Sequence, residues 1–270
     1  MKSPKSELWV GRKDELGALC HAIPRGESRL VWGPMDSGKT ALIEKAVSQL
    51  SDRERRRCVF WTGPASGRHL LSHFVAQLFA LGDPFVRKKI YADGAEGPPL
   101  GQWLGKQTSL RLRGILFTAL RQGQYRLFLD HFPAATHSMA RLMKEIMYRC
   151  ETPLYLIARG FSQDAIGYAW SLYWHDTLRL RVGPLSGREA RDLLELCIRS
   201  CSLGSLDLTD FREEILLLSG RLPGSIVRMC ELAADARYHS GDRIKAKLVH
   251  VDYLIRSDPS TTQPANTVLP

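Results

Sequence analysis

The sequence predicts an α/β fold with a parallel sheet and a phosphate-binding loop, followed by a smaller helical region. Residues 28–42 read SRLVWGPMDSGKTAL, in which an apolar strand, a glycine-containing loop and a helix-forming run follow one another. Four later apolar runs also have strand character, and the pattern after residue 185 is helical throughout. A chain of 270 residues with 44% hydrophobic content can bury one large core or two unequal ones.

The composition limits the classes of protein to consider. No apolar run approaches membrane-spanning length and the first residues lack an apolar leader, so we expect a cytoplasmic protein that makes no membrane contact. The six cysteines form no CxxC pair and are expected to be reduced core residues. A net charge of +10 and a pI near 9.5 favour an acidic partner such as nucleic acid. Basic residues that line a nucleotide site would raise the pI as well.

The loop after the first strand matches the pattern G-x-x-x-x-G-K-[ST], known as a P-loop. Its glycines let the backbone turn N–H groups around a phosphate chain, at the positive end of the next helix. Lys39 then reaches the β- and γ-phosphates, and Thr40 offers its hydroxyl to Mg²⁺. The residues predicted to bind the nucleotide here are Gly33, Pro34, Asp36, Ser37, Gly38, Lys39, Thr40 and Ala41.

Residues 125–132, YRLFLDHF, form an apolar strand that ends in an acid, as the Walker B motif of nucleotide-binding proteins requires. A carboxylate at the carboxyl edge of such a strand holds Mg²⁺ through its water shell. Thr40 and Asp130 are therefore the predicted metal-binding residues. His131 follows, and its neutral imidazole can accept a proton near pH 7.

Three segments between the first strands allow more than one interpretation. The run DRERRR at residues 52–57 is an exposed connector that could contact nucleic acid, although a solvated face is the more common role. His69 and His73 share one face of a helix at residues 69–81, where packing is favoured over zinc binding because no third ligand is near. Residues 82–106 form a long irregular stretch whose basic and aromatic residues suit single-stranded nucleic acid or pin the loop to the core.

Several segments resemble motifs of the AAA+ ATPases and of the related STAND signal-transduction ATPases. Residues 8–16, LWVGRKDEL, resemble the hhGRxxEL element that precedes the P-loop in these families. Residues 178–190, LRLRVGPLSGREA, resemble the junction with the helical lid and contain a capping box formed by Ser186 and Glu189. Residues 218–226, LSGRLPGSI, resemble the STAND GxP-type motif. The resemblance covers residues 8–255.

This resemblance implies a fold, a domain division and further site residues. It implies a P-loop NTPase three-layer core with a parallel sheet at residues 1–184 and a small all-helical lid domain at residues 185–256. Residues 257–270 are polar and contain proline, so we expect a disordered tail there. Val10, Gly11 and Pro223 would flank the adenine. Arg159, at the end of a strand that resembles sensor 1, would face the γ-phosphate, where arginine can grip oxygens bidentately. A strand-end arginine is also often merely exposed.

The chain departs from these families at three points. His131 stands where an acidic residue usually polarises the attacking water. Pro223 stands where most AAA+ proteins carry the sensor 2 arginine, a role that Arg228, one turn further on, could take. Residues 168–177 contain no arginine that a neighbouring copy could donate to the site.

From these observations we expect an ATP-binding module that acts as a nucleotide-dependent switch with slow or conditional hydrolysis. Its catalytic residues would be Lys39, Asp130, Arg159 and His131. Its cofactors would be ATP and Mg²⁺. Its partners would be ATP and ADP, together with another protein or a second copy of this chain. A DNA-associated accessory ATPase is the alternative, favoured by the basic charge and residues 82–106. It would lack a C-terminal winged-helix module and the acidic pair at Walker B. A small-molecule P-loop kinase is a third reading.

Overall fold

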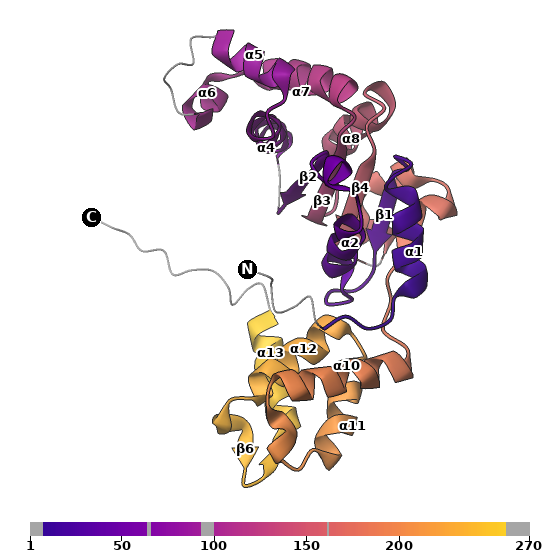
Figure 1. Cartoon of the computed structure of the whole chain (residues 1–270), viewed down its shortest axis with the longest axis vertical. Coiled ribbons are helices and arrows are strands. Elements are labelled where there is room, and N and C mark those ends of the chain that lie inside the picture. The colour runs from indigo at the N-terminus through magenta and orange to yellow at the C-terminus, as the bar shows by residue number, and fades with distance from the viewer. Residues whose placement is uncertain (1–7, 64–65, 93–99, 161, 258–270) are drawn as a thin grey trace, which may run out of the picture. The chain divides into compact units, whose positions relative to one another are not determined.

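A five-stranded parallel sheet forms the centre of the chain. The computed structural model describes residues 8–63, 66–92, 100–160 and 162–257 (Figure 1). The strands are β1 (Arg29–Trp32), β2 (Cys58–Thr62), β3 (Arg126–Phe132), β4 (Leu154–Ala158) and β5 (Arg179–Arg181), arranged in the order β2-β3-β4-β1-β5. β4 is buried at every position, as expected of a parallel strand that is covered on both faces. The predicted α/β core with a parallel sheet is confirmed.

Helices flank this sheet (Figure 1). They are α1 (Lys13–Ala22), α2 (Lys39–Ser48), α3 (Asp52–Arg55), α4 (Gly67–Ala80), α5 (Pro84–Ala92), α6 (Leu100–Lys106), α7 (Ser109–Gly123), α8 (His137–Arg149), α9 (Gln163–Ile166) and the 3₁₀ helices η2 (Tyr168–Tyr173) and η3 (Asp176–Leu178). Ser66, Thr108 and Thr136 each accept a backbone N–H at the start of α4, α7 and α8. Such side-chain caps fix where a helix begins, because the first N–H groups have no partner within the helix.

Three stacked aromatic rings cross the middle of the sheet. The centroids of Phe60 and Phe128 lie 4.6 Å apart and those of Phe128 and Tyr155 lie 4.5 Å apart. These residues are direct partners on β2, β3 and β4, so the stack follows from the register of the strands. The Tyr155 hydroxyl donates to the carbonyl of Ala22, 3.4 Å away, and connects the sheet to α1.

The expectation of an irregular stretch at residues 82–106 is wrong for the residues that the structure describes there. α5 begins at Pro84, whose missing N–H costs nothing at a first helical position. Asp83 caps this helix by accepting the N–H of Val86 at 2.8 Å. Val86 and Ile90 are buried one turn apart, and Trp103 of α6 is 4% exposed. Burial of Trp103 favours packing over a nucleic-acid role for that aromatic. Residues 93–99 lie outside the described part of the chain.

The chain divides into two compact units. The sheet unit comprises residues 13–35 and 39–182, and the C-terminal unit comprises residues 183–257 together with residues 8–12 and 36–38. The division at 182–183 lies close to the domain boundary proposed at residue 184. The P-loop sequence is therefore shared, because residues 36–38 belong with the C-terminal unit and the residues on either side of them belong with the sheet.

The C-terminal unit is mainly helical, with α10 (Gly187–Ser200), α11 (Thr209–Leu218), α12 (Pro223–Ala233), α13 (Ala246–Ser257) and the 3₁₀ helices η4 (Leu203–Ser205) and η5 (Ala236–Tyr238). The predicted capping box of Ser186 and Glu189 is confirmed at the start of α10. The unit is not all-helical, because β6 (His239–Ser240) and β7 (Arg243–Ile244) form a short antiparallel hairpin. α12 ends at Ala233, and Asp235 caps η5 by accepting the N–H of Arg237.

Two expectations concern the chain ends and the membrane. The tail expected to be disordered lies outside the described residues from residue 258 onward, and Ser257 is the last residue of α13. Within the described ranges, every helix is too short or too polar to cross a membrane.

The aromatic stack generates a stability prediction. Phe128→Ala would remove a fully buried ring and leave a cavity between Phe60 and Tyr155. We expect the free energy of unfolding to fall by about 3–5 kcal/mol, measured by urea denaturation. Tyr148→Ala is the matched control, since this ring is 54% exposed, and it should change stability little. Equal losses in the two variants would contradict the packing described here.

Candidate functional site

The P-loop follows β1 and leads into α2. Gly33 and Gly38 adopt φ angles of 153° and 86°, which favour glycine. Asp36 also has a positive φ, 61°, as an aspartate can where it turns the chain. The sequence pattern thus corresponds to a loop with three left-handed positions, and the helix that follows begins at Lys39.

The side chain of Lys39 turns back into its own loop. Its ammonium donates to the carbonyls of Gly33, at 2.9 Å, and Pro34, at 2.6 Å. Only 9% of the residue is exposed. A P-loop lysine acts as a point charge for phosphate oxygens, and this geometry holds the cation beside the loop backbone where such a ligand would lie.

Thr40 and Asp130 meet at the carboxyl edge of the sheet. The Thr40 hydroxyl donates to Asp130 Oδ2 at 2.8 Å, although the two residues are 90 positions apart in the sequence. Asp130 is 7% exposed, and its other oxygen accepts the N–H of His131 at 2.6 Å. A hydroxyl next to a buried carboxylate is an oxygen donor set of the kind that Mg²⁺ prefers, so these residues fit the expected metal.

Mg²⁺ in nucleotide sites is commonly held by one or two protein oxygens together with substrate phosphates and water. The described residues contain no group of three or more His, Cys, Asp or Glu side chains able to hold a metal by themselves. Thr40 and Asp130 would therefore bind the ion jointly with phosphate oxygens. When bound, the ion would supply positive charge to the phosphates.

His131 lies at an irregularity in β3. The pairing register with β4 shifts between Leu129 and Phe132, and His131 has a φ of 53°. A bulge of this kind re-aims side chains, so Asp130 is buried against Thr40 while the His131 side chain is 44% exposed. Its Nδ1 lies 3.9 Å from Asp130 Oδ1. The imidazole is therefore adjacent to the carboxylate and open to solvent.

Arg159 follows β4 directly and is exposed. No hydrogen bond or ion pair joins its guanidinium to another described residue. In the parallel sheet, the carboxyl ends of β1, β3 and β4 lie at one edge, where ligands bind in open α/β folds. The sheet unit thus brings the P-loop lysine, the Thr40–Asp130 pair, His131 and Arg159 to the same edge.

In the C-terminal unit, the side chain of Asp36 is enclosed by residues of α12 and α13. The Tyr253 hydroxyl donates to Asp36 Oδ2 at 2.7 Å and also lies 2.8 Å from the Ser225 hydroxyl. Burial, together with the Asp36 carboxylate, raises the pKa of Tyr253, which keeps the phenol protonated as a donor. A guanidinium nitrogen of Arg228 lies 3.5 Å from Asp36 Oδ1, and the backbone N–H of Gly224 donates to the Asp36 carbonyl at 2.8 Å.

The remaining predicted residues of the C-terminal unit lie around the same short segment. A Cβ placed on Gly38 would lie 3.3 Å from the Pro223 ring, so this proline packs on the P-loop glycine. Arg12 donates to the carbonyls of Ser37, at 3.1 Å, and of Gly183. Val10 packs against the helical core, and Gly11 approaches Glu189 so closely that a Cβ would overlap its carboxylate.

Two predicted nucleotide-binding residues differ in accessibility. Ser37 is fully buried, whereas Ala41 is exposed in the first turn of α2. Sequence reasoning missed Arg12, Ser225 and Tyr253 as neighbours of the P-loop. Arg12 was detectable as part of the hhGRxxEL element, but no pattern marks the other two.

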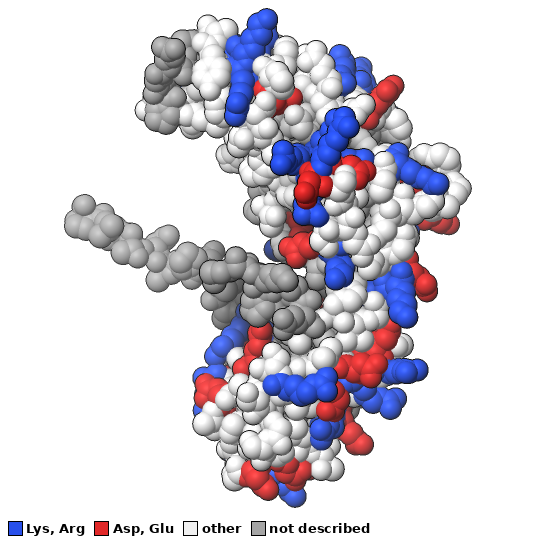
Figure 2. Space-filling view, viewed as in Figure 1, with Lys and Arg blue, Asp and Glu red and all other residues white. Residues whose placement is uncertain are grey.

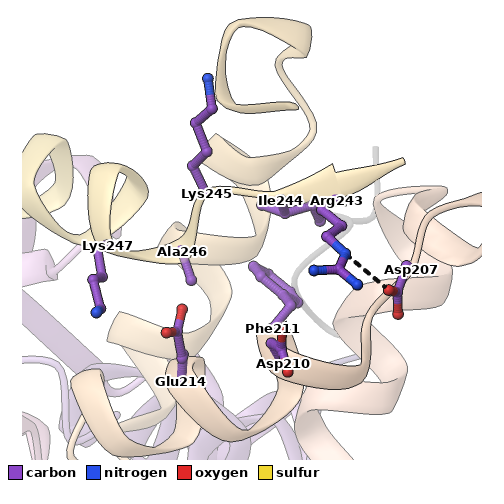
Figure 3. A pocket seen from close by; sticks show the side chains of 9 residues that line it. All are labelled: Asp207, Asp210, Phe211, Glu214, Arg243, Ile244, Lys245, Ala246 and Lys247. Carbon is purple, nitrogen blue, oxygen red and sulfur yellow. Dashed lines mark ion pairs between the residues drawn. The ribbon is translucent and has the colours of Figure 1, made fainter. Parts of the chain in front are cut away.

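A separate pocket of about 300 Å³ lies in the C-terminal unit, between the hairpin strand β7, α11 and the start of α13 (Figure 3). Asp207, Asp210 and Glu214 line it together with Arg243, Lys245 and Lys247. Arg243 pairs with Asp207 at 3.4 Å. Because acids and bases are equally represented, the pocket favours neither sign of ligand charge, and none of the predicted site residues lines it.

The Thr40–Asp130 pair generates a prediction about Mg²⁺. Asp130→Asn keeps the shape of the side chain but removes its charge. We therefore expect the factor by which Mg²⁺ increases ATP affinity to be about 10- to 100-fold smaller than in the unmodified chain. Isothermal titration of ATP with Mg²⁺ and with EDTA measures the difference. Asp164→Asn, at an exposed position of α9, is the control. An unchanged Mg²⁺ dependence in D130N would exclude Asp130 from the metal site.

No protein-family model and no curated protein matches the chain, but solved structures match its fold. A Walker-type ATPase of Pyrococcus abyssi is 13% identical with a TM-score of 0.57, covering 91% of this chain and 72% of its own length. The Orc1 protein of Aeropyrum pernix, in complex with DNA, is 17% identical with a TM-score of 0.53, covering 92% of this chain and 66% of its own.

A signal-transduction ATPase with numerous domains (STAND) from Pyrococcus horikoshii, which has a tetratricopeptide repeat sensor, is 16% identical. Its TM-score is 0.53, and the match covers 92% of this chain but 32% of that protein. The chain thus spans about two thirds of the Orc1 protein and about a third of the STAND protein. At these identities the likeness concerns the fold. It confirms what the motifs predicted: the chain has the fold of the AAA+ P-loop ATPases.

Proposed function

We propose that the chain binds ATP with Mg²⁺ and acts as a nucleotide-dependent switch. The observation that supports this proposal most is that the residues of the P-loop are divided between the two units. Asp36 is held by Tyr253, Ser225 and Arg228 within the C-terminal unit, while Lys39, three residues further on, belongs to the sheet unit. A change in the loop backbone around a phosphate would therefore act on the contacts of Asp36 through a very short piece of chain.

The proposed roles follow the chemistry of each group. Lys39 and the loop N–H groups would bind the phosphates, Thr40 and Asp130 would hold Mg²⁺, and Arg159 would contact the γ-phosphate. Val10, Gly11 and Pro223 would flank the adenine, a role taken from the AAA+ and STAND resemblance. Arg228 would stand in for sensor 2 by exchanging its Asp36 partner for a phosphate.

Slow or partner-stimulated hydrolysis follows from His131. A carboxylate at this position would be a general base in fixed geometry. The imidazole of His131 is instead exposed, and the backbone of this residue lies in a bulge. Residues 168–177 supply no arginine to a neighbouring copy, so a protein partner could supply the missing charge. We propose that this chain lies in the cytoplasm.

The alternative is a DNA-associated accessory ATPase. The net charge of +10 supports it, and so do Arg53 of α3 and Arg56 directly after it, which have no ion-pair partner among the described residues. The Aeropyrum pernix neighbour is a DNA complex, which is a property of that protein.

Binding and turnover of ATP test the proposal. We expect the unmodified chain to bind ATP and to hydrolyse it at least about 100-fold more slowly than the roughly 10 per second of a median enzyme. Lys39→Ala should abolish binding, whereas Lys106→Ala, which changes an exposed lysine of α6, should not. His131→Glu should raise turnover at least about tenfold, because it restores a carboxylate base.

Isothermal titration measures the binding and phosphate release measures the turnover. Binding that survives Lys39→Ala would refute the nucleotide site. Rapid hydrolysis by the unmodified chain would refute the switch and favour a motor.

A further inference from the structure

A second pocket, of about 520 Å³, opens on the sheet unit where β2 and β3 begin. Asp52, Arg53, Arg56 and Arg57 line it from α3 and the residues that follow, and Tyr125 lines it from the turn before β3. Figure 2 shows basic side chains gathered on this face of the sheet unit, with a few acidic ones among them. The pocket therefore combines three guanidinium groups with a single carboxylate.

The charged side chains of residues 52–56 differ in whether they have a hydrogen-bond or ion-pair partner. Arg55 pairs with Asp52 at 3.5 Å and donates to the carbonyls of Ser48 and Leu50, so both of these charged side chains have partners. By contrast, the guanidinium groups of Arg53 and Arg56 have no hydrogen bond or ion pair with any described residue. They lie three residues apart, which places them on neighbouring positions of one helix face.

The third arginine is positioned by its neighbours. Arg57 donates to Gln124 Oε1 at 2.6 Å, and Gln124 has a left-handed φ of 52° at the end of α7. α3 itself is fixed by a capping box in which Ser51 and Glu54 exchange hydrogen bonds. The sequence predicted an exposed connector at residues 52–57. The structure instead places these arginines on and directly after an ordered turn of helix.

This pocket is distinct from the proposed nucleotide site. Arg57 precedes β2 and Tyr125 precedes β3, so the pocket lies at the amino edge of the sheet, whereas the P-loop and Asp130 lie at the carboxyl edge. A strand of this length separates the two edges by roughly 15 Å.

We propose that the α3 pocket binds phosphate groups of a nucleic-acid backbone. Planar guanidinium groups bind phosphate oxygens bidentately, and Arg53 and Arg56 have no competing partners. Tyr125 is 8% exposed and its hydroxyl donates to Asp83, so its ring is not available to stack on a base. The contacts are therefore with the backbone and independent of sequence.

A nucleic acid fits better than a small phosphorylated ligand. The pocket is open, whereas sites for small ligands enclose most of the ligand's surface. A polyanion would in addition gain from the net charge of +10. The proposal goes beyond the ATP switch and does not depend on it.

Fluorescence anisotropy of a short labelled DNA duplex tests the proposal, with salt varied between about 0.05 and 0.3 M and no ATP present. Each phosphate contact contributes about 0.9 to the slope of log K against log salt. Arg53→Ala/Arg56→Ala should reduce that slope by about two and weaken binding roughly 10- to 100-fold at about 0.1 M salt, whatever the DNA sequence. Lys39→Ala should bind DNA as the unmodified chain does.

Two further variants separate the pocket from general charge. Arg53→Lys/Arg56→Lys retains the charge and should retain most of the slope. Lys245→Ala/Lys247→Ala removes the same charge from exposed positions of the C-terminal unit and should change the slope much less. Circular dichroism checks that each variant folds, which we expect because both arginine side chains are exposed.

Three outcomes would overturn the proposal. They are no DNA binding by the unmodified chain, an unchanged slope in Arg53→Ala/Arg56→Ala, and an equal loss in the Lys245→Ala/Lys247→Ala control. Pyrophosphate that binds at this pocket without any DNA binding would instead identify a small phosphorylated ligand, and would refute the nucleic-acid assignment.

Discussion

The hydrogen bond between Tyr253 and Asp36 holds the middle of the P-loop, residues 36–38, within the C-terminal unit. An aspartate in a phosphate-binding loop repels the ligand unless its charge is balanced. Arg228 faces it at 3.5 Å but is 53% exposed, and exposed ion pairs contribute about 0–1 kcal/mol. The buried phenol at 2.7 Å is a hydrogen bond to a charged group, worth about 1.5–3 kcal/mol. Tyr253, more than Arg228, is therefore expected to hold the carboxylate.

This arrangement gives the proposed switch a physical basis. A ligand shifts a conformational equilibrium only as far as it binds the two states differently. Within residues 36–38, Asp36 contacts α12 and α13, and the Ser37 carbonyl accepts from Arg12. Lys39 and Thr40, immediately afterwards, carry the groups that would bind phosphate and Mg²⁺. A phosphate that repositions this backbone would change both sets of contacts, so nucleotide affinity and the state of the C-terminal unit would be coupled.

Local patterns predicted much of this chain. The P-loop, the strand that carries Asp130 and the capping box at Ser186 were readable because each is encoded by adjacent residues. Residues 82–106 were misjudged because glycines and prolines obscured the spacing of Val86 and Ile90. The contact of Tyr253 with Asp36 spans 217 positions, and a lone tyrosine in an amphipathic helix carries no sign of it. The bulge at His131 depends on the pairing of β3 with β4, which a single strand does not reveal.

Amide hydrogen exchange of α12 and α13, with and without Mg²⁺–ATP, tests the central claim most directly. The account predicts that ATP changes protection in these helices and that Tyr253→Phe, which lacks the hydroxyl, removes most of this change while ATP still binds. Tyr148→Phe, at an exposed position of α8, should behave as the unmodified chain. Exchange in α12 and α13 that is indifferent to bound ATP, or equally responsive in Tyr253→Phe, would contradict it.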